Sequence, residues 1–149
     1  MAHGSYFSSK NDATAAWQAL LGQVEAVRRG WLDDGLLVTP AELARAWGQA
    51  PSALEALHER GELFRIRIGR GWYYPAAFKS LEEEEVIAVC RALRGDDTSA
   101  KFIFWNRRHS GLDGLTVAEA LRGKQAAKVR CLAAGWSAER GLMACARMR

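Results

Sequence analysis

The hydrophobic positions of this chain follow a helical period over most of its length and a strand period in one short stretch. Between Asp12 and Arg29, apolar residues recur at intervals of three and four, which predicts an amphipathic helix whose apolar stripe faces a core. We expect Asp12 to cap this helix, Gly30 to end it, and residues 1–10 to form a loose arm before it. The stripe consists of Trp17, Leu20, Leu21, Val24 and Val27.

Two short helices are predicted after a brief apolar strand at residues 36–38. Thr39 can cap the first helix, with proline at its first helical position and Glu42 completing a capping box. This helix is expected over residues 39–47, where a glycine follows it. The second helix is expected over residues 51–60, and another glycine follows it.

A β-hairpin is predicted next. Residues 63–68 alternate so that Ile66 and Ile68 occupy one face and arginines the other, the period-two pattern of a half-buried strand. Residues 69–71, Gly-Arg-Gly, predict a tight turn, and the aromatic residues of 72–75 predict the returning strand.

The second half of the chain is punctuated by helix caps. Ser80 with Glu83 forms one predicted capping box, and Thr116 with Glu119 forms another. The two aspartates before Thr98 are interpreted as a loop and a helix cap. The predicted helices cover residues 80–94, 98–107, 116–123 and 124–134.

These elements predict a mainly α fold: a winged helix-turn-helix with a short β-hairpin, plus a small C-terminal helical domain. The expected units are an N-terminal arm and helix (1–35), the winged helix-turn-helix (36–79), the helical domain (80–136) and a basic tail (137–149).

Composition fits a folded protein of one domain or two very small ones. The chain has 149 residues, of which 49% are hydrophobic, enough to build a core. Its apolar runs are too short to span a bilayer, and its polar N-terminus lacks a secretory signal core, so we expect a soluble, cytoplasmic protein without a membrane partner. The three cysteines are widely spaced, which favours free thiols over disulfides or zinc.

The positive charge lies in the second half. Residues 1–75 hold eight Lys or Arg and eight Asp or Glu, whereas residues 76–149 hold thirteen and nine, which accounts for the net charge of +4. A mild positive excess favours a polyanionic partner.

No catalytic constellation emerges from the sequence. The three histidines have no neighbours at metal-ligand spacing, and Ser110 beside His109 does not make a triad. We therefore predict that the protein is not an enzyme and that it has no catalytic residues, metal site or cofactor.

The predicted helix pair and hairpin suit a nucleic acid. In winged helix-turn-helix proteins the second helix enters the major groove, and the wing touches the phosphates or the minor groove. Arginines can hold phosphates in a forked geometry, while a serine or a glutamate on the second helix can discriminate bases. An ordinary solvated strand face would explain the same arginines. The candidate DNA-binding residues are Ser52, Glu55, Arg65, Arg67, Arg70 and Trp72.

About a quarter of the chain, residues 37–78, resembles the excisionase and MerR-like helix-turn-helix domains. This chain departs from their usual pattern on the second helix, where alanines and glutamates replace basic and polar residues. The residues that carry the resemblance are Thr39-Pro40, Glu42, Ala44, Trp47-Gly48, Pro51, Gly61-Glu62-Leu63, Ile66-Arg67-Ile68-Gly69-Arg70 and Pro75.

Residues 80–136 resemble the C-terminal domain of the Xre/MbcA/ParS antitoxins. The match rests on Trp105-Asn106, Leu112, Gly114, Thr116, Glu119-Ala120-Leu121, Gly123 and Val129. The resemblance implies a helical module that dimerises and holds a toxin, often a RES-type toxin that degrades NAD. A dimerisation domain without a toxin partner remains the alternative. The partner-binding residues it implies are Trp105, Asn106, Leu112, Thr116 and Glu119.

Together these observations predict a DNA-binding transcriptional regulator, an antitoxin-like autorepressor that binds double-stranded DNA as a homodimer and pairs with a cognate toxin. The competing hypothesis is a protein-interaction adaptor whose winged domain does not bind DNA specifically. The balanced charge of residues 1–75 favours that alternative.

Overall fold

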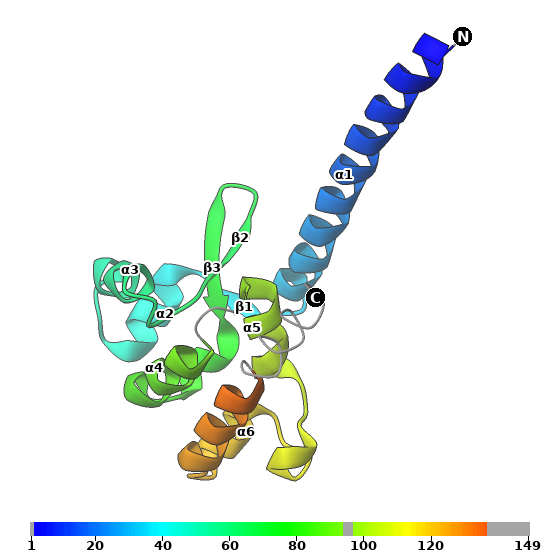
Figure 1. Cartoon of the computed structure of the whole chain (residues 1–149). Helices are drawn as coiled ribbons and strands as arrows, with labels where there is room; N and C mark the ends of the chain where they lie inside the picture. The colour runs from blue at the N-terminus through cyan, green and yellow to red at the C-terminus, as the bar shows by residue number, and fades with distance from the viewer. Residues whose placement is uncertain (1, 94–96, 137–149) are drawn as a thin grey trace.

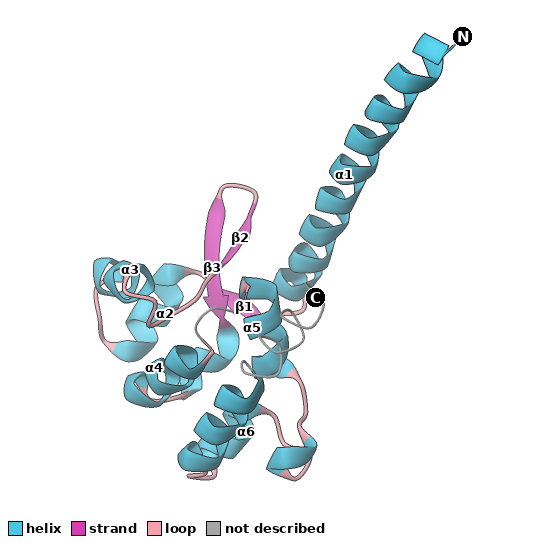
Figure 2. Ribbon diagram, in the orientation of Figure 1, coloured by secondary structure: helices cyan, strands magenta, loops and turns pink. Residues whose placement is uncertain are grey.

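The computed structural model describes residues 2–93 and 97–136, with side chains described from residue 14 onward. It is mainly helical, with one small antiparallel sheet set among the helices (Figure 2). In chain order the elements are α1 (Ala2–Asp33), β1 (Leu37–Val38), α2 (Pro40–Trp47), α3 (Pro51–Glu59), β2 (Ile66–Ile68), β3 (Gly71–Pro75), the 3-10 helix η1 (Ala76–Ser80), α4 (Glu83–Ala92), α5 (Thr98–Asn106), the 3-10 helix η2 (Ser110–Leu112) and α6 (Val117–Arg122).

The first helix is longer at both ends than the sequence predicts. Residues 2–10, expected as a loose arm, are helical, and the helix passes through Gly30 without ending. It ends at Asp33, and Gly35, whose φ of 77° is left-handed, closes it. The amide of Gly35 donates to the carbonyl of Leu32, and the amide of Leu36 donates to that of Trp31, the Schellman pattern that closes a helix.

The prediction that the apolar stripe of α1 faces the core of its own chain is wrong. Most of α1 extends away from the rest of the molecule (Figure 1), so its five predicted core residues are exposed. Only the last turns of the helix reach the body, where the Trp31 ring stacks on Phe102 at 4.2 Å between centroids. Periodicity reveals an apolar face but not what covers it.

The two short helices form over the predicted residues. Thr39 caps α2 by accepting a hydrogen bond from the amide of Glu42, and Gly48 closes the helix in the left-handed region at φ 64°. Helix α3 begins at the predicted proline. Leu43 of α2 and Leu54 of α3 are fully buried, so both helices pack on the same core.

The hairpin is also confirmed, and a third strand joins it. In β2, Ile66 and Ile68 are buried while the residue between them is exposed, as the alternation predicts. Strand β2 pairs with β3 antiparallel, and β1 pairs with the other edge of β3, which gives the order β1-β3-β2. A two-residue turn at Gly69, with φ 58°, joins β2 to β3.

One predicted cap in the second half is wrong and two are confirmed. Helix α4 starts after Glu82, because Ser80 still belongs to η1 and its hydroxyl donates to a carbonyl there. Asp97 caps α5 as predicted. Thr116 and Glu119 form the predicted reciprocal capping box on α6. Residues 126–136 are helical, close to the predicted last helix, and the predicted basic tail (137–149) lies outside the described residues.

Phe78 joins the front and back halves in one core. Its ring lies 5.6 Å from that of Phe64 and 4.9 Å from that of Trp105, both edge-on. The indole nitrogen of Trp47 donates to the carbonyls of Phe78 and Leu81, each at 3.1 Å. The predicted winged and C-terminal segments therefore share a buried cluster.

The thiols and acidic groups of the described residues show no metal cluster. Cys90 is buried, and its burial raises the pKa of its thiol to about 12, so the thiol stays protonated; Cys131 is exposed. No group of three or more potential metal ligands occurs in the described part of the chain. None of its helices is both long and apolar enough to cross a membrane.

We predict that Thr116→Ala destabilises the protein by about 1 kcal/mol, because it removes the side chain that caps α6. The free energy of unfolding, measured by urea denaturation, checks this value. Thr116→Ser keeps the hydroxyl and should retain most of the stability. Equal losses in the two variants would contradict a capping role.

Candidate nucleic-acid interface

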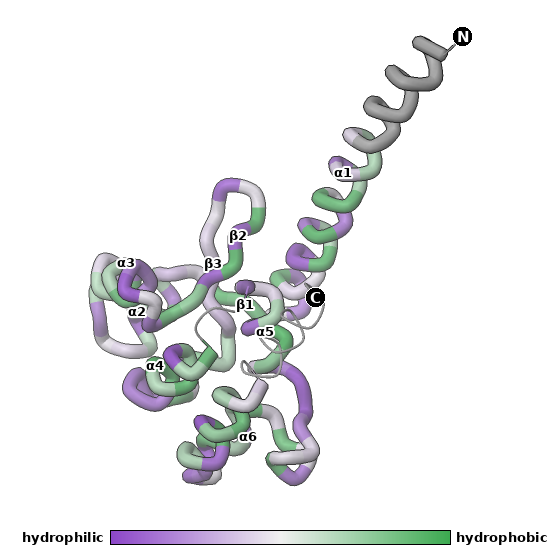
Figure 3. Tube along the Cα trace, viewed as in Figure 1, coloured by the Kyte–Doolittle hydropathy of each residue, from purple (hydrophilic) through white to green (hydrophobic). Residues whose placement is uncertain are grey.

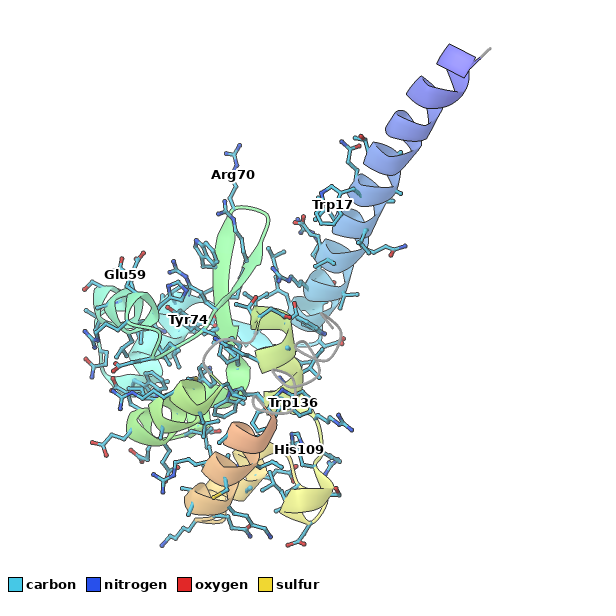
Figure 4. The ribbon with its side chains drawn as sticks, viewed as in Figure 1. Trp17, Glu59, Arg70, Tyr74, His109 and Trp136 are labelled. Atoms are coloured by element: carbon cyan, nitrogen blue, oxygen red, sulfur yellow. The ribbon has the colours of Figure 1, made fainter. Side chains whose placement is uncertain are left out.

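The β2–β3 hairpin stands out from the body beside α3 and carries the arginines that the sequence singles out. Arg70 lies at its tip and points away from the molecule (Figure 4). Arg67 is exposed on β2, where its Nε donates to the carbonyl of Gly69 at 3.1 Å. These two guanidinium groups are open to solvent and to an external anion.

Arg65 differs from the other two arginines because it is largely enclosed. Its side chain is 13% exposed, and its guanidinium carbon lies 4.2 Å from the centroid of the Trp72 ring. Glu55 of α3 pairs with it at 3.8 Å. Arg65 therefore connects α3 to the hairpin, and its predicted contact with phosphate would compete with these two partners. Arg67 approaches the same ring at 5.1 Å.

An open groove of about 550 Å³ separates α3 from the hairpin. Four of the six predicted DNA-binding residues line it, so the fold brings together residues far apart in the sequence. Glu55 is held by Arg65 in the groove, which reduces its freedom to accept from a base. Farther along α3, Glu59 is exposed and carries its negative charge outward (Figure 4). The four lining residues are Ser52, Glu55, Arg65 and Trp72.

Helix α1 is hydrogen-bonded to the hairpin, a contact that the sequence does not predict. The carboxylate of Glu25 accepts from the turn amide of Gly69 at 2.8 Å, and Arg29 pairs with the same carboxylate at 3.2 Å. Arg28 donates to the carbonyl of Arg67 at 3.1 Å. The same guanidinium donates to Ser99 at the start of α5 at 3.1 Å. The hairpin is thus held from α1 and α3.

His58 of α3 lies beside Trp72, and its pKa is lower than usual. Its ring centroid is 6.3 Å from that of Trp72. Burial lowers the pKa of His58, the positive charge of Arg65 lowers it further, and Glu55 and Glu59 oppose both effects. His58 is therefore neutral near pH 7 and adds no positive charge to the groove.

The five partner-binding residues implied by the antitoxin resemblance are buried in the core or bonded within α5 and α6. Trp105 and Leu112 are fully buried, so neither is presented to an external partner as folded. Asn106 donates to the carbonyl of Phe102 within α5. Thr116 and Glu119 cap α6, and those hydrogen bonds lower the pKa of Glu119.

Comparison of the chain with protein-family models, curated proteins and solved structures gives no match. The two resemblances in the sequence therefore stay predictions.

We predict that Arg65→Ala lowers the free energy of unfolding by about 1–2 kcal/mol, because a shielded cation–π contact and an ion pair are lost together. Arg67→Ala, a change at an exposed position, should alter stability by less than about 0.5 kcal/mol. Urea denaturation of both variants measures the difference. Equal stabilities would show that Arg65 does not join α3 to the hairpin.

We also predict a loss of stability as the pH falls below about 6.5. The unfolded chain binds a proton at His58 near that pH, whereas the folded chain binds it only at lower pH, so protonation favours unfolding. The carboxylates with shifted pKa values, Glu62 and Glu119, titrate below this window. Thermal denaturation between pH 7.5 and 5.5 should show a smaller decline for His58→Gln. An unchanged decline would assign the effect to other groups.

Proposed function

We propose that this protein binds double-stranded DNA as a transcriptional regulator, with the β2–β3 hairpin acting as the wing of a winged helix-turn-helix. The observation that carries the proposal is the position of Arg67 and Arg70. Both are exposed arginines on a hairpin that projects from the body beside a two-helix unit (Figure 1). Such a projection suits a DNA backbone or minor groove.

In this proposal the hairpin supplies most of the affinity, and α3 contributes less than is usual for a recognition helix. The Glu55 carboxylate is engaged by Arg65, and Glu59 would repel the phosphates. Ser52, at the exposed start of α3, is left as the main candidate for a contact to a base edge. We therefore expect binding that depends strongly on salt and modestly on sequence.

Two further parts of the proposal follow the resemblances. We propose that the regulator acts as a homodimer, since two matched wings suit two half-sites, and that it represses its own gene as an antitoxin does. A cognate toxin would bind elsewhere than at Trp105 and Leu112, because both are buried. Co-purification with the product of a neighbouring reading frame tests that part.

An adaptor function is the second candidate, favoured by the acidic, alanine-bearing outer face of α3. In that case the groove beside α3 receives a protein segment, and Arg65 only holds the fold together. The adaptor hypothesis predicts no discrete complex with DNA and no effect of hairpin arginines on what little DNA is bound.

We predict that Arg67→Ala combined with Arg70→Ala abolishes the discrete complex with the DNA upstream of the protein's own gene in a gel shift. With longer nonspecific duplexes, the slope of log affinity against log salt should fall by about 2, because two phosphate contacts are lost. Fluorescence anisotropy at several salt concentrations measures that slope.

A matched variant removes the same charge from the helix at residues 126–136. Lys128→Ala with Arg130→Ala, both exposed positions, should retain the discrete complex. Equal losses of DNA binding in the two double variants would mean that net charge alone, and not the position of the hairpin arginines, explains the binding. A wild-type protein that forms no complex at low salt would refute DNA binding and favour the adaptor.

A further inference from the structure

The stripe of α1 holds five of the six large hydrophobic residues that are exposed in the described part of the chain. Trp17 is 61% exposed and Val27 is 55% exposed, although both lie on one side of a continuous helix. The described part of α1 shows alternating apolar and polar segments along its free length (Figure 3). Contiguous apolar patches on a protein surface commonly mark an interaction site.

The spacing of the stripe is that of a coiled-coil seam. From Trp17 to Trp31, with Leu21 set aside as a flanking residue, the intervals alternate between three and four residues, which places the others at successive a and d positions of a heptad. A helix that packs on a globular core usually has a broader stripe. The uncovered seam residues are Trp17, Leu20, Val24 and Val27, and the pattern continues to Trp31, which packs on Phe102.

From this seam we infer that α1 is the dimerisation element of the protein and packs against α1 of a second copy. The inference deepens the proposed function, because it names the surface through which two DNA-binding units would meet. It does not require that DNA be bound.

The residues that flank the seam favour an identical helix as the occupant. Ala16, Gln23 and Gly30 border one side, and none carries a charge that would meet its like across a two-fold contact. On the other side Leu21 widens the apolar surface. Arg28 is already engaged by the carbonyl of Arg67 and the hydroxyl of Ser99.

The size of the uncovered surface also fits a second copy. The six exposed apolar side chains, those of the stripe and Ile103 of α5, present on the order of 500 Å², if a whole large side chain buries about 150–200 Å². That is the greater part of the roughly 800 Å² that each partner contributes to a standard interface. Ile103 faces a groove of about 320 Å³ between α1 and α5, which continues the seam toward the body.

A membrane surface is a poorer occupant. Helices that lie in the lipid interface carry many lysines and arginines on their polar face. Between residues 14 and 33, the only lysines or arginines of α1 are Arg28 and Arg29, and both are paired with other groups of the chain.

Dimerisation through α1 would set the distance between the two hairpins. Because Glu25 holds the turn amide of Gly69 and Arg28 holds the carbonyl of Arg67, each hairpin is fixed to the helix that forms the interface. Joining two such helices therefore fixes two wings relative to each other, as paired half-sites require.

Light scattering after size exclusion tests the inference on the full-length protein without DNA. The wild type should have twice the chain mass of 16.5 kDa. Leu20→Glu, which places a charge in the seam, should have the mass of one chain at the same concentration. Ala19→Glu adds the same charge one residue away and off the seam, and should stay a dimer. A monomeric wild type, or a dimer in all three proteins, overturns the inference.

Disulfide cross-linking tests the same contact without a disruptive charge. In a background of Cys131→Ser with Cys145→Ser, Trp17→Cys alone should link two parallel helices, and Trp17→Cys with Val27→Cys should link two antiparallel ones. Either product supports the interface, and a protein that links in neither arm overturns it. Ala19→Cys, off the seam, is the control.

Failure here and failure of DNA binding can be told apart. A monomer that still gives a gel shift dependent on Arg67 and Arg70 refutes the α1 interface and leaves the proposed function standing. A dimer that binds no DNA does the reverse. A monomer that instead binds vesicles of phosphatidylcholine and phosphatidylserine overturns the second copy in favour of a lipid surface.

Discussion

The contact between α3 and the hairpin centres on one enclosed cation. The Arg65 guanidinium lies over the Trp72 ring of β3 and is paired with Glu55 of α3, so one side chain contacts both elements. Because the Arg65 side chain is only 13% exposed, removing Glu55 would leave its charge poorly solvated, whereas Glu55 itself is 59% exposed. The same arrangement determines the chemistry of the candidate interface. It neutralises a carboxylate in the groove, helps to keep His58 uncharged, and leaves only the outer arginines of the hairpin for an external anion.

Local chemistry made much of the fold predictable. Thr39 and the Thr116–Glu119 pair cap helices as their spacing indicates, and the alternation of Ile66 with Ile68 gives the buried face of β2 correctly. The errors arise where two local signals compete. Ser80 could have capped a helix, but it belongs to the 3-10 helix η1, where its hydroxyl donates to a carbonyl. Helix α4 therefore begins after Glu82. Gly30 could have ended α1, but the Schellman closure requires a left-handed residue, and Gly35 provides it.

The site is predictable only in part, because contacts between distant segments have no local signature. The sequence places Arg65 and Arg67 on one face by alternation. Both guanidinium groups do lie against the Trp72 ring, but the alternation does not indicate that Arg65 is enclosed beside Glu55 while Arg67 stays exposed. The bracing of the hairpin by Glu25 links residues 44 positions apart, and no sequence motif marks it. The small and apolar residues of the antitoxin resemblance describe turns, caps and core, which explains why Trp105 and Leu112 are internal.

The closure at Gly35 leaves α1 as a long helix that is fixed to the body at one end. The glycine fixes the elbow at which the helix leaves the body, and the ring stack at Trp31 holds the helix just before that elbow. Beyond the elbow, 32 helical residues form a rod of roughly 50 Å, at about 1.5 Å per residue. The helix is held at its C-terminal end by the Trp31–Phe102 stack, and near that end it is hydrogen-bonded to the hairpin. Because Glu25 and Arg28 of α1 are hydrogen-bonded to the hairpin, a displacement of the helix would be transmitted to the turn that carries Arg70.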